Sequence, residues 1–469
     1  MWCRFPLVHP AATCYIVFVA GKKKRCLLIN PWIYDFAAYD FWLKPLGLLY
    51  LASFLRENGC EIAFLDCLNP LHPALPSEGR IKASKRTPSG RGSLPKEFIT
   101  RPEALTSIPR RYKRYGISPD IFRDDLRAEE RPEVVLVTSM MTYWYPGVFS
   151  VIRQVRDVFP GVPVVLGGIY TTLCREHAAR CAGADYVLPG EGELSLARLL
   201  RDLFNDEPAF DIRDKDLDDL PYPAFDLMPV KDQFPIMTSR GCPFRCTYCA
   251  SHLLSSRFTF RDPIRVVDEI DHWHHRYGIR NFSFYDDALL IQARQRAVPM
   301  MREVIRRGLD CDFHCPNGLH LRGITAEVGR LLYRSRFRTI RFGLETVCAK
   351  RQSETGGKVT NEELRSAVAY LTEAGYRPED IGVYLLCGLP DQAAGEIRES
   401  VDLVKSYGAR PILAEFSPIP GTPIWEDALR VSPYPIAEEP LFHNNTLLPC
   451  RSDSLTPETF QDLKRRCRA

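Results

Sequence analysis

The sequence lacks any apolar run long enough to cross a membrane. Its most apolar early stretch, Ala11 to Ala20, is far shorter than the ~20 residues that a spanning helix needs. A basic run at 22–25 follows this stretch instead of preceding it, which is the wrong order for a secretory signal. We therefore expect no membrane span and a cytoplasmic protein in which residues 1–24 are a dispensable extension or a spare strand.

The sequence also has little net charge, only +4 from 62 basic and 58 acidic residues, which gives no reason to expect a nucleic acid as partner. Hydrophobic residues make up 45% and charged residues 26% of the chain, as in globular proteins with large cores. Its 469 residues suffice for two to four domains at ~150 residues each. Sixteen cysteines without an export signal indicate a reducing compartment, where metal ligation or burial is commoner than disulfides.

Buried strands alternate with amphipathic helices in the first half of the chain. Helical spacing of apolar residues is seen at 46–59, which ends on a glycine, and at 145–161. The expected strands are 26–30, 61–67, 133–139, 162–168 and 184–193. This alternation predicts a parallel sheet covered on both faces, with ligands bound beyond the carboxyl ends of its strands.

Residues 71–130 interrupt this series with a stretch rich in Arg, Lys, Ser, Gly and Pro that shows no periodicity. We expect an irregular insertion, because segments of this length without periodicity are usually lids, binding loops or disordered. Residues 109–116, PRRYKRYG, form a basic and aromatic patch that suits either a phosphate or corrin side chain, or a solvated loop.

An acidic, proline-rich linker is expected at 206–232, and a second alternating series follows it. Expected strands at 234–241, 280–287, 309–318, 337–346, 380–390 and 411–422 each end in polar or glycine-rich residues. Asp262 caps a helix that starts at Pro263, and Thr360 with Glu363 forms a capping box. Six strand–helix units predict an incomplete α/β barrel whose functional end is the rim where the strands finish.

The expected fold is therefore α/β, a Rossmann-like parallel sheet followed by a partial (β/α)6 barrel. Its domains are an extension at 1–24, the Rossmann-like domain at 25–205 with its insertion at 71–130, a linker at 206–232, the barrel at 233–430 and a C-terminal extension at 431–469.

Three cysteines, Cys242, Cys246 and Cys249, follow the first barrel strand in a C-x3-C-x2-C loop that has no fourth cysteine. Three thiolates on one short loop can hold three corners of a 4Fe–4S cubane and leave the fourth iron open. The alternatives are a zinc half-site, for which His252 is one candidate partner, and reduced structural cysteines. Cys311 and Cys315 lie within an expected strand and show no spacing for a further cluster.

The C-x3-C-x-aromatic-C loop at the end of a first barrel strand resembles the radical S-adenosylmethionine (SAM) superfamily. In that family the open iron chelates SAM, and one electron cleaves it to methionine and a 5′-deoxyadenosyl radical. Polar or glycine-rich residues after the other strands resemble the family's SAM cradle. The resemblance assigns to SAM Tyr248, Asp286, Asp287, Asn317, Gly343, Glu345, Gly388 and Pro420.

Three loops of the first domain resemble the cobalamin-binding domain found ahead of many radical SAM barrels. They are TSMMTYWYPG, LGGIYTTL and PGEGE, each directly after an expected strand. The glycines would let backbone approach the nucleotide tail of the cofactor. The resemblance assigns to cobalamin Ser139, Met140, Thr142, Tyr143, Gly167, Gly168, Ile169, Gly190, Glu191 and Gly192. The alternative is a Rossmann-like domain that has kept this shape without the ligand.

The first loop departs from cobalamin domains that carry D-x-H-x-x-G, because no histidine occurs between His9 and His72. A histidine from that loop cannot ligate cobalt, as is often so in the radical SAM branch. Cobalt would then be held without it, with Tyr143 or Trp144 as candidates to face it, which favours a reactive low-valent state.

The resemblance implies an enzyme that uses a 4Fe–4S cluster, SAM and cobalamin to methylate an unactivated carbon. One SAM would methylate cobalt, a second would give the radical, and no catalytic side chain is assigned beyond the cofactor ligands. Expected partners are a small-molecule or lipid-like substrate and a low-potential donor of ferredoxin or flavodoxin type. The alternatives are a cobalamin-dependent ring closure or oxidation, and a non-catalytic cobalamin or redox sensor.

Overall fold

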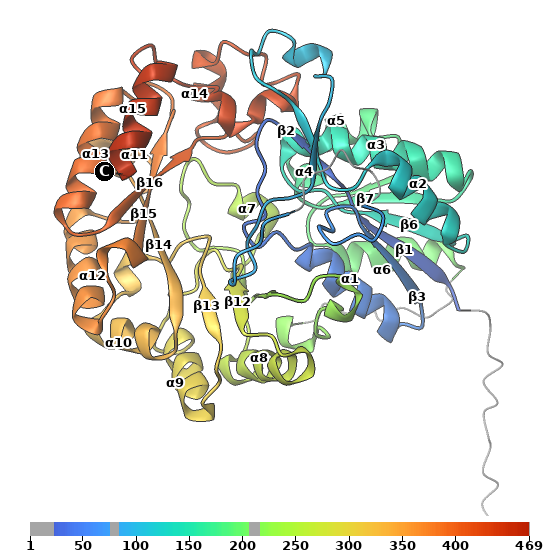
Figure 1. Cartoon of the computed structure of the whole chain (residues 1–469), viewed down its shortest axis with the longest axis horizontal. Coiled ribbons are helices and arrows are strands. Elements are labelled where there is room, and N and C mark those ends of the chain that lie inside the picture. The colour runs from blue at the N-terminus through green and yellow to red at the C-terminus, as the bar shows by residue number, and fades with distance from the viewer. Residues whose placement is uncertain (1–22, 76–83, 206–215, 469) are drawn as a thin grey trace, which may run out of the picture.

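The computed structural model describes residues 23–75, 84–205 and 216–468. Figure 1 shows two α/β units side by side, with the first unit in blue to green and the second in yellow to red. The expected extension at 1–24 and the first part of the expected linker fall mostly outside the described residues. No helix among the residues described is long and apolar enough to cross a membrane.

The first unit is built on a five-stranded parallel sheet with the order β3-β1-β6-β7-β8. Its strands are β1 (Arg25–Asn30), β3 (Glu61–Asp66), β6 (Val134–Val137), β7 (Val164–Gly167) and β8 (Tyr186–Leu188). Successive residues of each strand face opposite sides of the sheet, as the pleat requires. The five strands and their order of appearance confirm the expected alternation.

Helices cover both faces of this sheet. Leu28 of β1 packs with helices α1 (Leu46–Glu57) and α6 (Gly192–Leu203) on one face. Leu27 packs on the other face with α2 (Pro119–Ala128), α3 (Tyr145–Val158) and α5 (Arg175–Cys181). The short helix α4 (Ile169–Leu173) starts directly after β7. This two-sided burial explains why the strands read as continuous apolar runs.

The described part of the expected insertion is ordered, unlike the irregular segment that the sequence suggested. Strands β2 (Ile33–Asp35), β4 (Lys96–Phe98) and β5 (Lys113–Tyr115) form a small antiparallel sheet in the order β2-β5-β4. α2 belongs to the Rossmann-like layer, and Ser118 caps it by accepting a hydrogen bond from the backbone N–H of Ile121. Three-residue strands are too short to show an alternating pattern in the sequence.

The second unit is an open six-stranded parallel sheet with the order β9-β12-β13-β14-β15-β16, as a partial barrel requires. The strands are β9 (Phe234–Ile236), β12 (Asn281–Phe284), β13 (Asp312–His314), β14 (Phe337–Glu345), β15 (Ile381–Cys387) and β16 (Arg410–Glu415). The two-stranded ribbon β10 (Ser239–Arg240) and β11 (Thr259–Phe260) flanks the loop that follows β9.

Helices cover the outer face of the barrel, where the main hydrophobic core lies. The longer ones are α8 (Pro263–Tyr277), α9 (Ala297–Arg307), α10 (Ala326–Arg334), α12 (Asn361–Ala374) and α13 (Ala394–Ser406). The Asp262 cap and the Thr360–Glu363 capping box form as expected. The shorter helices are α7 (Ser251–Leu254), α11 (Ala349–Glu354) and α14 (Trp425–Val431), and α15 (Pro457–Arg468) ends the described chain.

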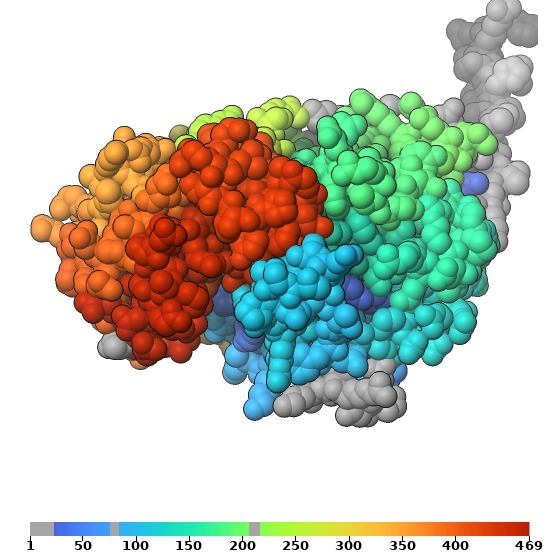
Figure 2. Space-filling view, turned by 90° about the horizontal axis from the view of Figure 1, so that it is seen from above, coloured from blue at the N-terminus to red at the C-terminus, as the bar shows by residue number. Residues whose placement is uncertain are grey.

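The C-terminal segment and the insertion pack against each other, far apart in sequence. Leu105 and Tyr112 of the insertion share a hydrophobic cluster with Leu441 and Phe442. Figure 2 shows this contact, with the insertion in light blue against the orange-red C-terminal region. The two segments thus join the first unit to the barrel along one side.

The barrel interior receives a side chain from the first unit. Trp42 adopts a left-handed conformation (φ 65°), and its ring stacks on His314 of β13, with the ring centroids 4.5 Å apart. His314 is buried, pairs with Thr339 and Asn281 at 2.9 and 3.1 Å, and burial lowers its pKa to about 4. This stack packs a side chain of the first unit against strand β13 of the barrel.

Candidate functional site

The cysteine loop begins where β10 ends and is held by close backbone packing. Gly241 has a φ of 81°, and a Cβ placed there would lie 2.4 Å from the carbonyl oxygen of Arg257. The backbone N–H of Cys249 donates to the carbonyl of Cys246 at 3.0 Å, which folds the loop into a turn. Only glycine suits position 241, so the backbone is fixed directly before the first cysteine of the loop, Cys242.

The three cysteine side chains of this loop are free thiols in a partly buried setting. Cys246 is buried, and Cys242 and Cys249 are half-buried. Burial raises the pKa of Cys249 to about 11 and also raises that of Cys242, so metal binding at these thiols must displace protons. Three sulfur donors on one loop fit the three protein-held corners of a 4Fe–4S cluster, where each thiolate binds a different iron.

No group of three His, Cys, Asp or Glu side chains within 23–75, 84–205 and 216–468 converges closely enough to hold a single metal ion. The other described cysteines are free as well, and Cys311 and Cys315 are fully buried beside β13.

An ion pair between the half-buried Lys358 and the buried Glu345 lies beside the cysteine loop. Lys358 Nζ contacts Glu345 Oε1 at 2.6 Å and sits 5.5 Å from the centre of the Tyr248 ring. Burial opposes the charge on Lys358, but Glu345 and then Cys246 outweigh it, so the pKa of the lysine is raised. Gly343 makes room for this pair, because a Cβ there would lie 2.5 Å from Glu345. The sequence had suggested Gly343 and Glu345 but not Lys358.

The two aspartates after β12 have different surroundings. Asp286 is 2% exposed and accepts hydrogen bonds from Thr238 and Ser239, so its carboxylate binds the end of the neighbouring strand. Asp287 instead opens into a cavity, where Ser251 donates to it. Asp287 is thus available to a ligand, whereas Asp286 is committed to the protein.

The remaining rim residues lie where the expected strands end. Asn317 is exposed, and its amide donates to the carbonyl of Tyr285 at 2.9 Å. Gly388 has a φ of 83° and donates through its backbone N–H to Gln392. Pro420 is half-buried in the turn after β16. The strand ends bring these groups to the same edge of the sheet.

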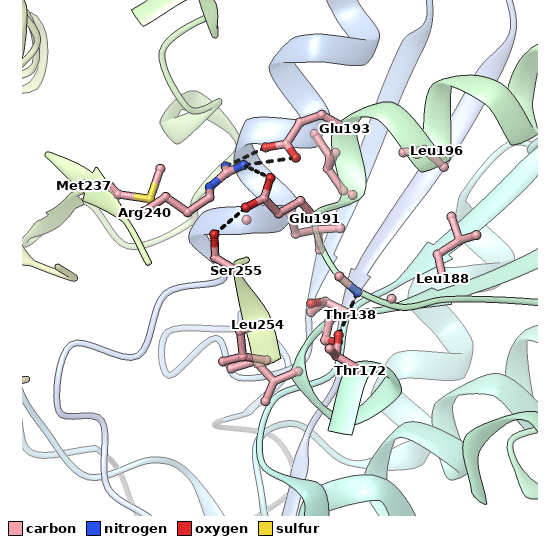
Figure 3. A pocket seen from close by; sticks show the side chains of 18 of the residues that line it. Thr138, Thr172, Leu188, Glu191, Glu193, Leu196, Met237, Arg240, Leu254 and Ser255 are labelled. Carbon is pink, nitrogen blue, oxygen red and sulfur yellow. Dashed lines mark hydrogen bonds and ion pairs between the residues drawn. The ribbon is translucent and has the colours of Figure 1, made fainter. Parts of the chain in front are cut away.

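A cavity of about 320 Å³ joins the rims of the two units. From the first unit it is lined by the ends of β6, β7 and β8 and by the first turns of α1 and α6, and from the barrel by β10, α7 and the β12 loop. Figure 3 shows Leu188 and Leu196 on one side of it and Met237 and Leu254 on the other. Its sequence-expected lining residues are Gly167, Gly168, Ile169, Gly190, Glu191, Gly192 and Asp287.

The lining suits the nucleotide tail and ring edge of a corrin, since it is mostly apolar with a few convergent polar groups. Gly167 faces open space, and its Cβ would make only an ordinary contact, 3.8 Å from the carbonyl of Leu188. A Cβ at Gly190 would have no atom within 4 Å, and the Gly190 backbone N–H donates to the Thr172 hydroxyl at 2.8 Å. These positions form a cradle that side chains would fill.

Gly168 has a different reason to be glycine from the one expected. A Cβ there would lie 2.2 Å from the carbonyl oxygen of Ser139, and the φ of Gly168 is 105°. The missing side chain therefore lets two loops of the protein meet, and the Gly168 backbone still lines the cavity. Ser139 itself is buried and donates to the carbonyl of Gly167 at 2.7 Å.

Hydrogen bonds from the C-terminal segment hold the loop that contains Met140, Thr142 and Tyr143. His443 pairs with the Thr142 hydroxyl at 3.0 Å, and Tyr143 donates to Asn445 at 3.3 Å. Trp144 donates to Asp35 at 2.7 Å.

Neither Tyr143 nor Trp144 lines the 320 Å³ cavity, whereas Met140 and Trp144 line a smaller one of about 20 Å³. None of the described residues that line the 320 Å³ cavity between the two rims is a histidine.

An ion pair that the sequence did not reveal closes the seam between the units. Arg240 Nη2 contacts Glu193 Oε1 at 2.7 Å, and Arg240 Nη1 lies 3.4 Å from Glu191. Ser255 donates to Glu191 at 2.7 Å, as Figure 3 shows. Burial lowers the pKa of Arg240, but Glu193 outweighs it and the pKa is raised. Arg240 lies two residues before Cys242, so the pair ties the cysteine loop to the first turn of α6.

Two family models match the chain, the radical SAM superfamily over residues 236–404 and the B12 binding domain over residues 116–200. An uncharacterised methyltransferase of Pyrococcus horikoshii is 26% identical over 329 residues, 64% of this chain and 70% of that protein. An anaerobic magnesium-protoporphyrin IX monomethyl ester cyclase of Cereibacter sphaeroides is 23% identical over 347 residues. That match covers 66% of this chain but only 55% of the cyclase.

Among solved structures, the radical SAM methyltransferase TsrM of Kitasatospora setae, with tryptophan and a SAM analogue bound, has a TM-score of 0.66. The match covers 95% of this chain and 89% of that one at 17% identity, which shows the same fold.

Proposed function

The chain belongs to the cobalamin-dependent radical SAM family, and we propose that it transfers a methyl group from SAM to an unactivated carbon. Enzymes of this family use a 4Fe–4S cluster, SAM and cobalamin. The observation that carries the proposal is the single cavity lined by both rims, because a methyl carrier and a radical source must reach one substrate carbon together.

We assign the cofactors to the residues as follows. Cys242, Cys246 and Cys249 hold three irons of the cluster. The SAM site takes Tyr248, Asp287, Asn317, Gly343, Glu345, Gly388 and Pro420, with Asp286 fixing the turn that carries Asp287. The cobalamin site takes Gly167, Gly168, Ile169, Gly190, Glu191 and Gly192, which line the cavity, while Ser139, Met140, Thr142 and Tyr143 shape the loop after β6 beside it.

When bound, the cluster supplies the electron that cleaves SAM, and cobalamin carries the methyl group. The chain's own side chains then orient the bound SAM and shield the reaction from water. Ser251 holds the Asp287 carboxylate toward the cavity, where it suits the amino group of SAM. Lys358 places a half-buried positive charge beside the thiolates of Cys246 and Cys249, which favours their charged form. The apolar lining of the cavity excludes water from a reactive radical.

Two further assignments complete the proposal. The enzyme works in the cytoplasm on a small or lipid-like substrate, in keeping with the free cysteines throughout the described chain. An external low-potential donor of ferredoxin or flavodoxin type supplies the electron. A ring closure or oxidation is the second candidate, favoured by the similarity to the cyclase.

The test uses anaerobically reconstituted protein, a low-potential reductant, SAM with a labelled methyl group and a panel of acceptors. Each methylated product should appear with one S-adenosylhomocysteine and one 5′-deoxyadenosine, and should contain the label. Cys246→Ala should form no 5′-deoxyadenosine, whereas Cys315→Ala, a buried cysteine outside the loop, should form it as the wild type does.

The outcomes separate the candidates. Deoxyadenosine without methyl transfer and without S-adenosylhomocysteine would replace methylation by ring closure or oxidation. Neither product, with cluster and corrin intact, would favour a non-catalytic sensor.

A further inference from the structure

A second, larger pocket of about 1010 Å³ lies on the barrel away from the cysteine loop. It is lined by the starts of β15 and β16, the ends of α13 and α15, and Phe41 and Arg91 from the first unit. In Figure 1, α13, α15 and β16 lie together at the outer end of the barrel. Its strand residues stand near the amino ends of the strands, opposite the rim that carries the cofactor residues.

Basic side chains dominate this pocket. Its charged lining residues are Arg91, Arg341, Lys405, Arg410, Lys464 and Arg468 against a single carboxylate, Glu379. That carboxylate pairs with Arg377 at 3.2 Å, and Lys464 pairs with Glu415 at 2.9 Å. Among the described residues, no carboxylate forms an ion pair with Arg91, Arg341 or Arg410. The pocket therefore has an excess of positive charge without internal compensation.

Arg341 gives the strongest indication of a bound anion because its charged side chain is buried. It is 7% exposed, on the inward face of β14, and its Nη1 donates to the carbonyls of Ile340 and Asp380 at 2.7 and 3.4 Å. Gly382 of the neighbouring strand makes room for it, since a Cβ there would lie 2.8 Å from Nη1. Carbonyl oxygens satisfy some N–H groups but do not neutralise the charge.

The neighbours of Arg341 add to the unfavourable charge. Burial lowers the pKa of its guanidinium, and the nearby Arg410 and Arg91 lower it further, while Tyr384 opposes them. Arg91 is oriented by its contacts over the rings of Phe41 and Trp42, at 5.4 and 5.2 Å. A buried cation without a counter-charge is costly, and a purely structural residue at this position would not need the charge.

We propose that this pocket is an anion-binding site that takes a small molecule through a carboxylate or phosphate group, held by Arg341, Arg410 and Arg91. Guanidinium groups bind both kinds of anion through paired, charge-assisted hydrogen bonds. Tyr384, Phe41 and Ile412 supply polar and apolar walls for the rest of the ligand. The site is separate from the cofactor cavity, so it does not depend on the proposed reaction.

The experiment is calorimetric titration of the full chain with inorganic phosphate and, separately, with citrate, at constant ionic strength set by chloride. Wild type should bind at least one of the two anions. The anion that binds more tightly shows whether the site prefers a phosphate or a carboxylate group. Arg341→Met should weaken binding by ~10-fold or more, because a charge-assisted contact is lost. Arg410→Gln, at an exposed position, should also weaken binding.

Arg338→Gln is the matched control. Arg338 lies on the same strand, β14, but it is exposed, does not line the pocket and pairs with Asp312 at 2.9 Å. The Arg338→Gln variant should bind the anion as tightly as the wild type does. The proposal is overturned if the wild type binds neither anion, if Arg410→Gln binds as tightly as wild type, or if Arg338→Gln weakens binding as much as Arg410→Gln.

Discussion

Removing Arg240 should loosen the seam between the two units. Arg240→Gln keeps a polar side chain but removes the charge and leaves the Glu193 carboxylate without its partner. Breaking a buried pair costs ~3–5 kcal/mol, whereas an exposed pair is worth less than ~1 kcal/mol. The side chains of Arg240 and Glu193 are 20% and 19% exposed, between these limits. We therefore expect a loss of about 2 kcal/mol in the free energy of unfolding, consistent with partial solvent screening.

The assay is urea denaturation of the cofactor-free protein, with a double-mutant cycle between Arg240→Gln and Glu193→Gln. The double variant should lose less stability than the sum of the single variants, since it leaves no unpaired charge. Arg56→Gln is the control, because the Arg56–Asp226 pair also joins distant segments but is 36% and 39% exposed. Equal losses in Arg240→Gln and Arg56→Gln, or strict additivity in the cycle, would refute the reasoning.

Three further predictions concern the cofactors and acid stability. Reconstituted protein should hold about four irons per chain, and Cys246→Ala should lose them while Cys315→Ala keeps them, as measured by iron and sulfide analysis. Gly167→Val should block cobalamin uptake by filling the cavity, and Gly395→Val, at another uncrowded glycine, should not; equal uptake in equilibrium dialysis would move the corrin elsewhere. Since burial lowers the pKa of His314 to about 4, its contribution of up to ~3 kcal/mol is present above pH ~6.5 and is lost as pH falls toward 4. Cofactor-free His314→Gln should therefore destabilise less on acidification than wild type, and a parallel loss in both would contradict this.

The order of the strands and helices could be predicted from the sequence because each element has a regular apolar period. The caps at Asp262 and Thr360 and the glycine before Cys242 carry local signals that the structure follows. The small sheet of β2, β4 and β5 could not be predicted, since strands of three residues show no period and pair only through the tertiary fold.

The parts of the site that the sequence missed depend on long-range contacts. Arg240 meets Glu193 across 47 residues, and Lys358 reaches Glu345 only because α11 folds the chain back. Which of the predicted residues face the cavity depends on burial, which the sequence does not show. Asp286 and Asp287 are adjacent and chemically identical, yet one bonds to Thr238 inside the protein and the other faces the cavity. Gly168 shows the same limit, because its neighbour Ser139 is 29 residues away.

The central claim is that the cofactors meet in one cavity, and electron paramagnetic resonance of cobalt(II) cobalamin tests it directly. Ser251 and Asp287 line the cavity, and Ser251 is two residues from Cys249. Cobalamin bound there should show spin–spin broadening when the cluster is reduced, and this broadening should vanish in Cys246→Ala. The spectrum should lack nitrogen splitting from a protein histidine, since none lines the described cavity. A cobalt signal that is the same with the reduced cluster as without it, or that carries histidine splitting, would contradict the account.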